Sequence, residues 1–280
     1  MPDNRTQTLE APTPVNPARG DSVTIVWHLG FIKTGTTAIQ QMLRKGRHLM
    51  PPTVTAFRRQ DEAVHVRVAC RKWRQKPTKE KRAAVVQAVQ DVRDAAVESG
   101  VEFAIFSDEN VVEFEAYSHR GDIFEAAQRT IPLLEEAAYP AKSVFVFYTR
   151  DFDKWLESAH NQTVKMLRLV DDFETYRANV PFEMNWDAQK AALQATVKSD
   201  VIFHDMAEDI DSDLPLGSGL MALCNIDCGF LEQLPESSRK NESLSPAALK
   251  FMLQINRSDL SNASVRKIRQ MVMQNSEMFE

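Results

Sequence analysis

The protein has 280 residues, of which 43% are hydrophobic and 26% are charged, which is the composition of a globular chain long enough for one large domain. Its net charge of −5 gives no general reason to expect nucleic acid as a partner, and its three cysteines lack the spacing of a disulfide framework or a zinc site. No stretch approaches the ~20 apolar residues of a membrane span or forms a signal sequence, so we expect a soluble, cytoplasmic protein without a membrane span.

Residues 1–20 are polar and contain four prolines, and they predict a flexible N-terminal tail ahead of one domain over residues 21–280. Short apolar runs rich in Val, Ile and Phe then predict strands buried on both faces. These strands are Val23–Leu29, Val101–Phe106, Ser143–Thr149 and Val201–Phe203.

Helical spacing fills the stretches between these strands. The first apolar stripe, Ala38 to Leu43, is followed by Gly46 as a C-cap, and the last predicted helix opens with Ser245 as N-cap and Pro246 at the first position. Further helices are expected over Ala83 to Val97, Ser158 to Val170 and Trp186 to Val197. Strands that alternate with helices predict an α/β fold, a parallel sheet flanked by helices in a single domain.

The segment HLGFIKTGTTAIQQML follows the first predicted strand and opens the first helix, which is the setting of an anion site. Gly30 and Gly35 keep the spacing of the nucleotide phosphate loop, and Thr37 stands at its Ser/Thr position. Thr36, however, occupies the place of the loop lysine, and Lys33 lies two residues before the second glycine. The segment therefore predicts a modified phosphate-binding loop.

The pattern K-T-G-T-T after a buried strand resembles the 5′-phosphosulfate loop of the sulfotransferase family, whose fold is related to that of the P-loop kinases. The resemblance implies a P-loop-type sheet and the donor 3′-phosphoadenosine 5′-phosphosulfate, with no metal ion required. It implies that Lys33 contacts the bridging oxygen of the leaving group. It also implies that Thr34, Gly35, Thr36 and Thr37 hold the 5′-phosphate.

A second likeness lies at the strand that ends in Thr149 and Arg150. In sulfotransferases such a strand ends in an arginine, followed eight residues later by a serine, and both bind the 3′-phosphate; here these residues are Arg150 and Ser158. The alternative is that Arg150 forms an ion pair with Asp151 or Asp153 while Ser158 is merely exposed.

A third likeness lies at Ser238-Arg239-Lys240-Asn241, followed by E-S-L-S-P, which resembles the basic segment that closes over the 3′-phosphate. Asn241 replaces a glycine of the animal enzymes, and a solvated basic pair before a helix cap is an equally good interpretation. Ala38 stands where those enzymes place an adenine-stacking Trp, so that residue is not identified by the sequence.

The second long strand ends in Ser107, Asp108, Glu109 and Asn110, and the carboxyl ends of parallel strands face one crevice. Sulfotransferases that act on sugars place a glutamate base near this point, so Glu109 is the first candidate for the catalytic base and Asp108 the second. Solvated carboxylates before the next helix are the structural alternative. His28 is a further candidate, although we expect it to pack beside the loop and hydrogen-bond it.

The residues 55–100 are expected to form a helical region on the acceptor side, and they contain a basic run around Trp73. This run over residues 67–82 is typical of a solvated helix face, or it could receive an anionic acceptor.

The sequence thus favours a sulfotransferase that acts on a hydroxyl or amine of a small molecule or carbohydrate. A Mg²⁺-dependent P-loop kinase is the enzyme alternative, because an apolar strand leading to Asp108 resembles a Mg²⁺-holding element. A nucleotide-binding protein without chemistry is the other. The acceptor and the oligomeric state are not indicated by the sequence.

Overall fold

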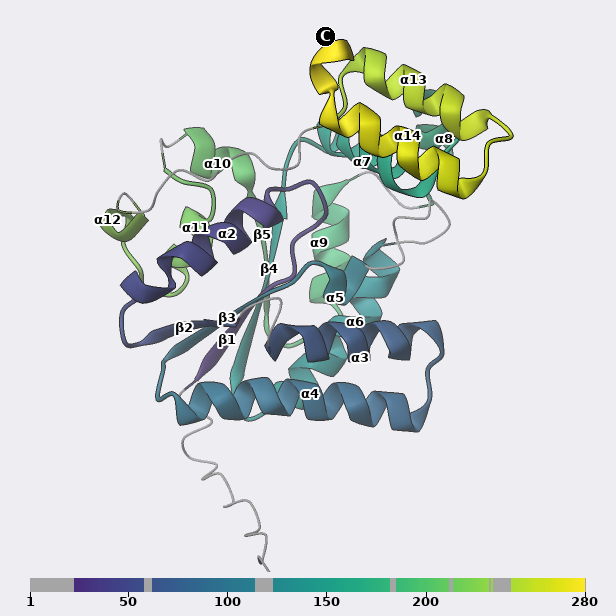
Figure 1. The fold of residues 1–280 in the computed structure, drawn as a ribbon. Coiled ribbons are helices and arrows are strands. Elements are labelled where there is room, and N and C mark those ends of the chain that lie inside the picture. The colour runs from purple at the N-terminus through teal and green to yellow at the C-terminus, as the bar shows by residue number, and fades with distance from the viewer. Residues whose placement is uncertain are drawn as a thin grey trace, which may run out of the picture.

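The computed structural model describes residues 23–57, 62–113, 123–181, 185–211, 214–231, 233 and 243–279. Its centre is a five-stranded sheet in the order β2-β3-β1-β4-β5, in which every pair of neighbours is parallel (Figure 1). Helices cover both faces, so the predicted α/β fold with a helix-flanked parallel sheet is confirmed. The predicted tail over residues 1–20 lies outside the described residues.

The four predicted strands are all present, with ends shifted by up to two residues: β1 Thr24–His28, β3 Phe103–Ser107, β4 Lys142–Thr149 and β5 Asp200–Asp205. The sequence analysis missed β2, Val54–Phe57, which pairs with β3 at the edge of the sheet. It fell within the region expected to be helical. Its sequence, Val-Thr-Ala-Phe, is not a continuous apolar run of the kind that marked the other strands, and periodicity alone does not separate it from a helical pattern.

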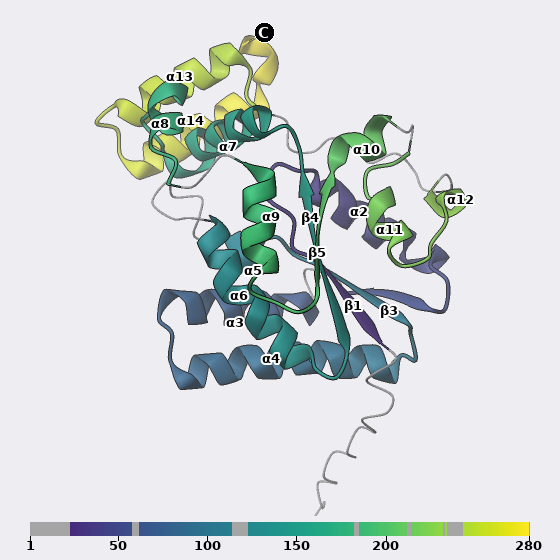
Figure 2. The ribbon, with the colours of Figure 1, turned by 180° about the vertical axis from the view of Figure 1, so that it is seen from behind.

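Side chains along β1 alternate between two hydrophobic layers, which explains its continuous apolar run. Val26 faces α2 (Thr36–Gly46) and α11 (Ser218–Ala222), whereas Ile25, Trp27 and Leu29 face the opposite layer. Figure 2 shows that this second layer is built largely from helices on the other side of the sheet. These helices are α3 (Glu62–Gln75), α4 (Lys79–Glu98), α6 (Ile123–Ala138) and α9 (Trp186–Gln194).

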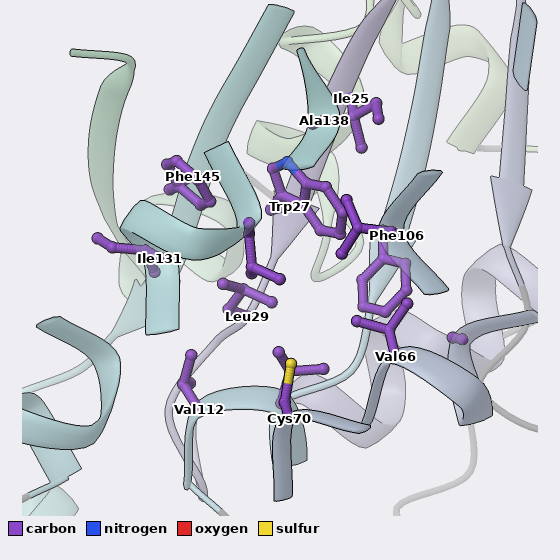
Figure 3. Close-up of a cluster of buried hydrophobic side chains, with 14 of the residues drawn as sticks. Ile25, Trp27, Leu29, Val66, Cys70, Phe106, Val112, Ile131, Ala138 and Phe145 are labelled. Atoms are coloured by element: carbon purple, nitrogen blue, oxygen red, sulfur yellow. The ribbon is translucent and has the colours of Figure 1, made fainter. Parts of the chain in front are cut away.

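The larger core is centred on Trp27, which is fully buried between β3 and β4 (Figure 3). Its ring lies 4.9 Å from that of Phe106 and 6.4 Å from that of Phe145, and its Nε1 donates to Ser143 Oγ over 3.1 Å. The indole thus buries its apolar surface and satisfies its only donor. Truncation of such a residue to Ala typically costs about 3–5 kcal/mol of stability.

Local geometry explains where three of the helices begin or end. Two of these boundaries differ from the sequence expectations and one agrees with them. Gly46 was expected to end α2 as a C-cap, which was wrong, because its φ of −83° is right-handed and the chain continues into the 3₁₀ turn Arg47–Leu49. Helix α7 (Phe152–Leu167) begins a turn and a half earlier than expected, since the Asp151 side chain accepts from Lys154 N. The N-cap of α13 (Pro246–Arg257) at Ser245 is confirmed by the bond from Ala248 N.

The C-terminal helices α13 and α14 (Asn262–Gln274) pack with α7 and α8 (Phe173–Ala178) beyond the upper end of the sheet (Figure 1). Their apolar cluster includes Val164, Ala248 and Met252. The remaining short elements are α5 (Asn110–Glu113), α10 (Met206–Asp211), α12 (Cys228–Leu231) and η2 (Ser276–Phe279). No helix within the described ranges is long and apolar enough to cross a membrane.

The strand order determines where a ligand can bind. β1 lies between β3 and β4, and the chain order turns in opposite directions on its two sides, which is the switch point where ligands of open α/β sheets bind. His28 at the end of β1 is opposite Ser107 of β3 and Val146 of β4. The segments that follow these three strands therefore meet at one edge.

Candidate active site at the carboxyl edge of the sheet

The loop between β1 and α2 has a backbone that few residues adopt. Gly30, Lys33 and Gly35 have φ values of 33°, 63° and 84°, all in the left-handed region. A non-glycine residue there carries strain of about 1–3 kcal/mol, which persists only where surrounding contacts impose it. Thr34 Oγ1 and Thr36 Oγ1 impose it here, because both donate to the Phe31 carbonyl, over 2.6 and 3.2 Å.

The N-terminus of α2 carries backbone amides that the helix itself does not bond. Gly35 precedes the helix without a side-chain cap, and the first amides bonded to its carbonyl are those of Ala38 and Ile39. The amides ahead of them have no partner within the helix by its geometry, and the helix dipole adds positive potential. Any other residue at Gly35 would be strained by the φ of 84°, and its Cβ would lie 2.1 Å from Leu216 Cδ2, so that side chain would have to move.

Lys33 extends from this loop into a cationic environment. Its side chain is partly buried, and burial lowers its pKa, with the charges of Lys165 and Arg150 lowering it further. Arg150 Nη1 also donates to the Lys33 carbonyl at 3.4 Å, which ties the end of β4 to the loop. The structure therefore brings Lys33 and Arg150 together.

Arg150 and Ser158 line one cavity of about 610 Å³ with residues of α7, α8 and the start of α13. Asp151 caps α7 by accepting from Lys154 N, and Asp153 pairs with Arg177 at 2.9 Å, so each of these carboxylates has a partner other than Arg150. Ser158 is buried rather than exposed. The alternative of a strand-edge ion pair beside an exposed serine does not describe this arrangement.

The third predicted element, Arg239, Lys240 and Asn241, lies outside the described residues. The chain just after it approaches the same cavity, because Ser243 and Leu244 contribute to its lining. Asn161 of α7 holds this stretch by exchanging two hydrogen bonds of 3.0 Å with the Leu244 backbone.

Asp108 and Glu109 both lie at the end of β3, but their surroundings differ. Asp108 is fully buried and accepts from Arg67 Nη1 at 2.9 Å and from the backbone and side-chain nitrogens of Asn110. Glu109 is 7% exposed, and its Oε2 accepts from Gln40 Nε2 at 2.8 Å. Neither is the solvated carboxylate of the structural alternative.

His28 is fully buried and its pKa falls to about 3, because burial penalises the charged ring. It packs beside the loop as expected, and its Nε2 would lie 3.2 Å from a Cβ on Gly30. The expected hydrogen bond to the loop is absent among the described residues: Nδ1 bonds Ser107 Oγ at 2.8 Å, and Nε2 is buried without a partner. His28 is therefore held neutral.

This geometry agrees with the comparison to known protein families. A sequence model described as a sulfotransferase domain matches residues 25–209, well over half of the chain. The chain belongs to the sulfotransferase family. Among curated proteins, no sequence matches it. The matched range contains the loop, both strand-end carboxylates, Arg150 and Ser158, and it identifies the protein as a transferase enzyme that acts in sulfuryl transfer.

Several residues that position this sulfotransferase site were not found from the sequence. Gln40 contacts Glu109, and Trp155 Nε1 donates to the Ile32 carbonyl at 2.8 Å, which fixes α7 against the loop. Trp186 Nε1 donates to the Arg150 carbonyl at 2.7 Å. A pointer to Trp155 was its position three residues before Ser158, on the same face of a helix.

The basic run over residues 67–82 is only partly a solvated face. Arg71, Lys72 and Lys76 are exposed, as expected. Arg67 reaches Asp108, and the buried Arg74 donates to the carbonyls of Val111 and Asn110. These two arginines join α3 to the strand end that carries both candidate bases.

Proposed function

We propose that this sulfotransferase moves a sulfuryl group from 3′-phosphoadenosine 5′-phosphosulfate to a hydroxyl or amine of a small molecule or carbohydrate. The observation that carries the proposal is the contact between Arg150 and the phosphate loop. Arg150 bonds the Lys33 carbonyl and lines the same cavity as Ser158, so one donor with two anionic ends could span both.

The residues present suit such a donor. The uncapped amides at the start of α2 can donate hydrogen bonds to a 5′-phosphate, and Thr37, which is partly exposed, adds a hydroxyl. The Arg150 guanidinium and the Ser158 hydroxyl match the 3′-phosphate that distinguishes this donor from ATP. The hydroxyls of Thr34 and Thr36 both donate to the Phe31 carbonyl. We therefore propose that these two side chains hold the loop conformation rather than contact the donor.

An aromatic surface for the adenine is available in the same cavity. Phe173 of α8 is partly exposed and lines this cavity with Arg150 and Leu249. Since Ala38 cannot stack on a base, Phe173 is our candidate for that role.

In the transfer, the acceptor oxygen or nitrogen forms a bond to sulfur while the bond between sulfur and the bridging oxygen breaks. The electron pair of that bond stays on the leaving phosphate, where the Lys33 ammonium stabilises it. The proton of the acceptor passes to a carboxylate base. We assign this to Glu109 because Asp108 is committed to the Arg67 cation and to Asn110.

The Mg²⁺-dependent kinase remains the alternative to be tested directly. Its metal would bridge the transferred phosphates, so excess chelator should stop it. We expect sulfation from the phosphoadenosine donor to continue in chelator. If activity vanished with chelator and returned with Mg²⁺, the proposal would be abandoned.

Donor choice is tested by thermal unfolding with ATP or adenosine 3′,5′-bisphosphate, because a ligand that binds only the native state raises its stability according to its affinity. The bisphosphate should stabilise the protein and ATP should not. Lys33→Ala should remain folded and lose about 10²–10³ in turnover. A folded Lys33→Ala protein with near wild-type sulfation would end its assignment.

A further inference from the structure

Two buried asparagines, Asn161 and Asn256, tie α7 to α13 and the chain that leads into it. Asn161 of α7 is 7% exposed and bonds both backbone groups of Leu244, which lies two residues before α13 begins. Asn256 of α13 is 2% exposed, and its Nδ2 donates to the carbonyls of Val164 and Leu169 over 2.9 Å each. Each side chain therefore makes two hydrogen bonds between the same two parts of the chain.

The side chain of Asn161 bonds Leu244 in the way that one strand bonds another. Its Nδ2 donates to the Leu244 carbonyl and its Oδ1 accepts from the Leu244 amide, each over 3.0 Å. Two bonds to one residue fix both the position and the orientation of its backbone. Because backbone groups away from water need such partners, the Asn161 amide holds the chain at Leu244 against α7.

The two asparagines differ in their relation to the cavity that Ser158 lines. Asn161 contributes to this lining, and so do Ser243 and Leu244. Ser158 precedes Asn161 by three residues, which places both side chains on one face of α7. The part of the wall that α7 forms is thus bonded at Asn161 to the part that Leu244 forms. Asn256 is not among the described residues that line the cavity.

The chain after Leu244 is anchored separately. Ser245 caps α13 by accepting from Ala248 N, and its Oγ donates to the carbonyl of Phe279 at 2.8 Å. Because α13 is held in this way at its first turn, the two bonds of Asn161 set how closely the chain just before it approaches α7. The width of the cavity beside Ser158 follows from that approach.

We propose that Asn161 is a positioning residue for recognition of the 3′-phosphate, because it holds the chain at Leu244 against α7. The phosphate bound by Arg150 and Ser158 is then sheltered from water. This inference rests on the proposed function. Hydrogen bonds to a phosphate are stronger where the local dielectric constant is low, so a loosened wall weakens this end of the donor. The 5′-phosphate is held by the loop, which α7 contacts through Trp155.

Direct binding measurements separate this role from a structural one. Calorimetric titration of the whole chain would compare adenosine 3′,5′-bisphosphate with adenosine 5′-monophosphate, which lacks the 3′-phosphate. Asn161→Leu keeps the shape of the side chain but removes both bonds to Leu244. It should lower the preference for the bisphosphate, given by the ratio of the two dissociation constants, about 10-fold. Asn161→Ser, whose side chain is too short for both bonds, should shift this ratio in the same direction.

The matched control is Asn256→Leu, which breaks the other tie between α7 and α13. Asn161→Leu and Asn256→Leu should both lower the midpoint of thermal unfolding, because both leave backbone carbonyls without their partner. Only Asn161→Leu should change the preference for the bisphosphate. If Asn256→Leu changed it equally, the effect would belong to the packing of α13, and the inference would be overturned.

The outcomes also separate this inference from the proposed function. If the wild type bound neither nucleotide, or bound both equally well, the proposed function itself would fail. If the wild type preferred the bisphosphate and Asn161→Leu kept the full preference, only the role of Asn161 would be refuted. Equal losses for both nucleotides, or failure of both Asn161 variants to fold, would assign Asn161 to the fold alone.

Discussion

His28 should make the folded protein sensitive to mild acid. Its ring is fully buried and its pKa is about 3, against an ordinary value near 6.5 in the unfolded chain. The native state therefore binds fewer protons than the unfolded state between these pH values, so the free energy of unfolding falls as the pH drops below 6.5. The physical reason is burial, which penalises the charged ring, and Nε2 is buried without an acceptor for the N–H that the charged ring would add.

The magnitude follows from the same two pKa values. Each pH unit well inside this window costs about 1.4 kcal/mol, and the whole loss between pH 7.5 and 5.5 should also be about 1.4 kcal/mol, since the upper half of that interval lies above 6.5. Burial also lowers the pKa of His160, whereas the bond to Asp209 raises that of His204. A single wild-type curve would mix all three contributions.

The assay is therefore a comparison of the wild type with His28→Gln, by urea unfolding at both pH values. His28→Gln is expected to be less stable at pH 7.5, because it disturbs the Ser107 contact and the packing against Tyr148, but it should lose about 1.4 kcal/mol less on going to pH 5.5. Equal pH dependence of the two proteins, or an NMR titration of His28 near pH 6.5, would refute the reasoning.

Three further predictions concern the site. Glu109→Gln should lower turnover about 10²–10⁴-fold with donor affinity little changed; a larger loss in a folded Asp108→Asn protein would transfer the role of base to Asp108. Removal of the 3′-phosphate from the ligand should weaken its binding to the wild type strongly and its binding to Arg150→Ala hardly at all. Calorimetry on both proteins with both ligands gives the coupling energy between Arg150 and the 3′-phosphate, and a value of zero would leave Arg150 a structural role only. Gly35→Ala should abolish donor binding, because both its φ of 84° and the Leu216 side chain oppose a Cβ. Gly100→Ala is the matched control, with a φ of 68° and open space around it, and should show only the backbone cost of about 1–2 kcal/mol in urea unfolding; equal donor binding by the two variants would contradict this account of the loop.

Local patterns in the sequence were sufficient for the parts of this protein that depend on neighbouring residues. The four short apolar runs became strands of the sheet, since a strand buried on both faces must be continuously apolar. Ser245 and Pro246 began a helix because capping uses residues within one turn. The loop at Lys33 was recognisable for the same reason, because its glycines act through their own backbone and the Thr34 hydroxyl bonds a carbonyl only three residues away.

Tertiary structure decided how the two candidate bases differ in their surroundings. Asp108 and Glu109 are adjacent in sequence, but only the packing of α3 brings Arg67 to one of them, and only α2 brings Gln40 to the other. No local pattern could separate these carboxylates, because their partners lie far from them along the chain.

The edge strand β2 and the buried Lys165 depended on tertiary structure in the same way. Val54–Phe57 is a strand because β3 pairs with it, and its Val-Thr-Ala-Phe sequence lacks the continuous apolar run that predicts such a pairing. In the sequence Lys165 is indistinguishable from an exposed helix lysine, and only the packing of α7 against the phosphate loop shows otherwise. The burial of Lys165 and the effect of its charge on Lys33 are properties of the packed molecule and not of any segment alone.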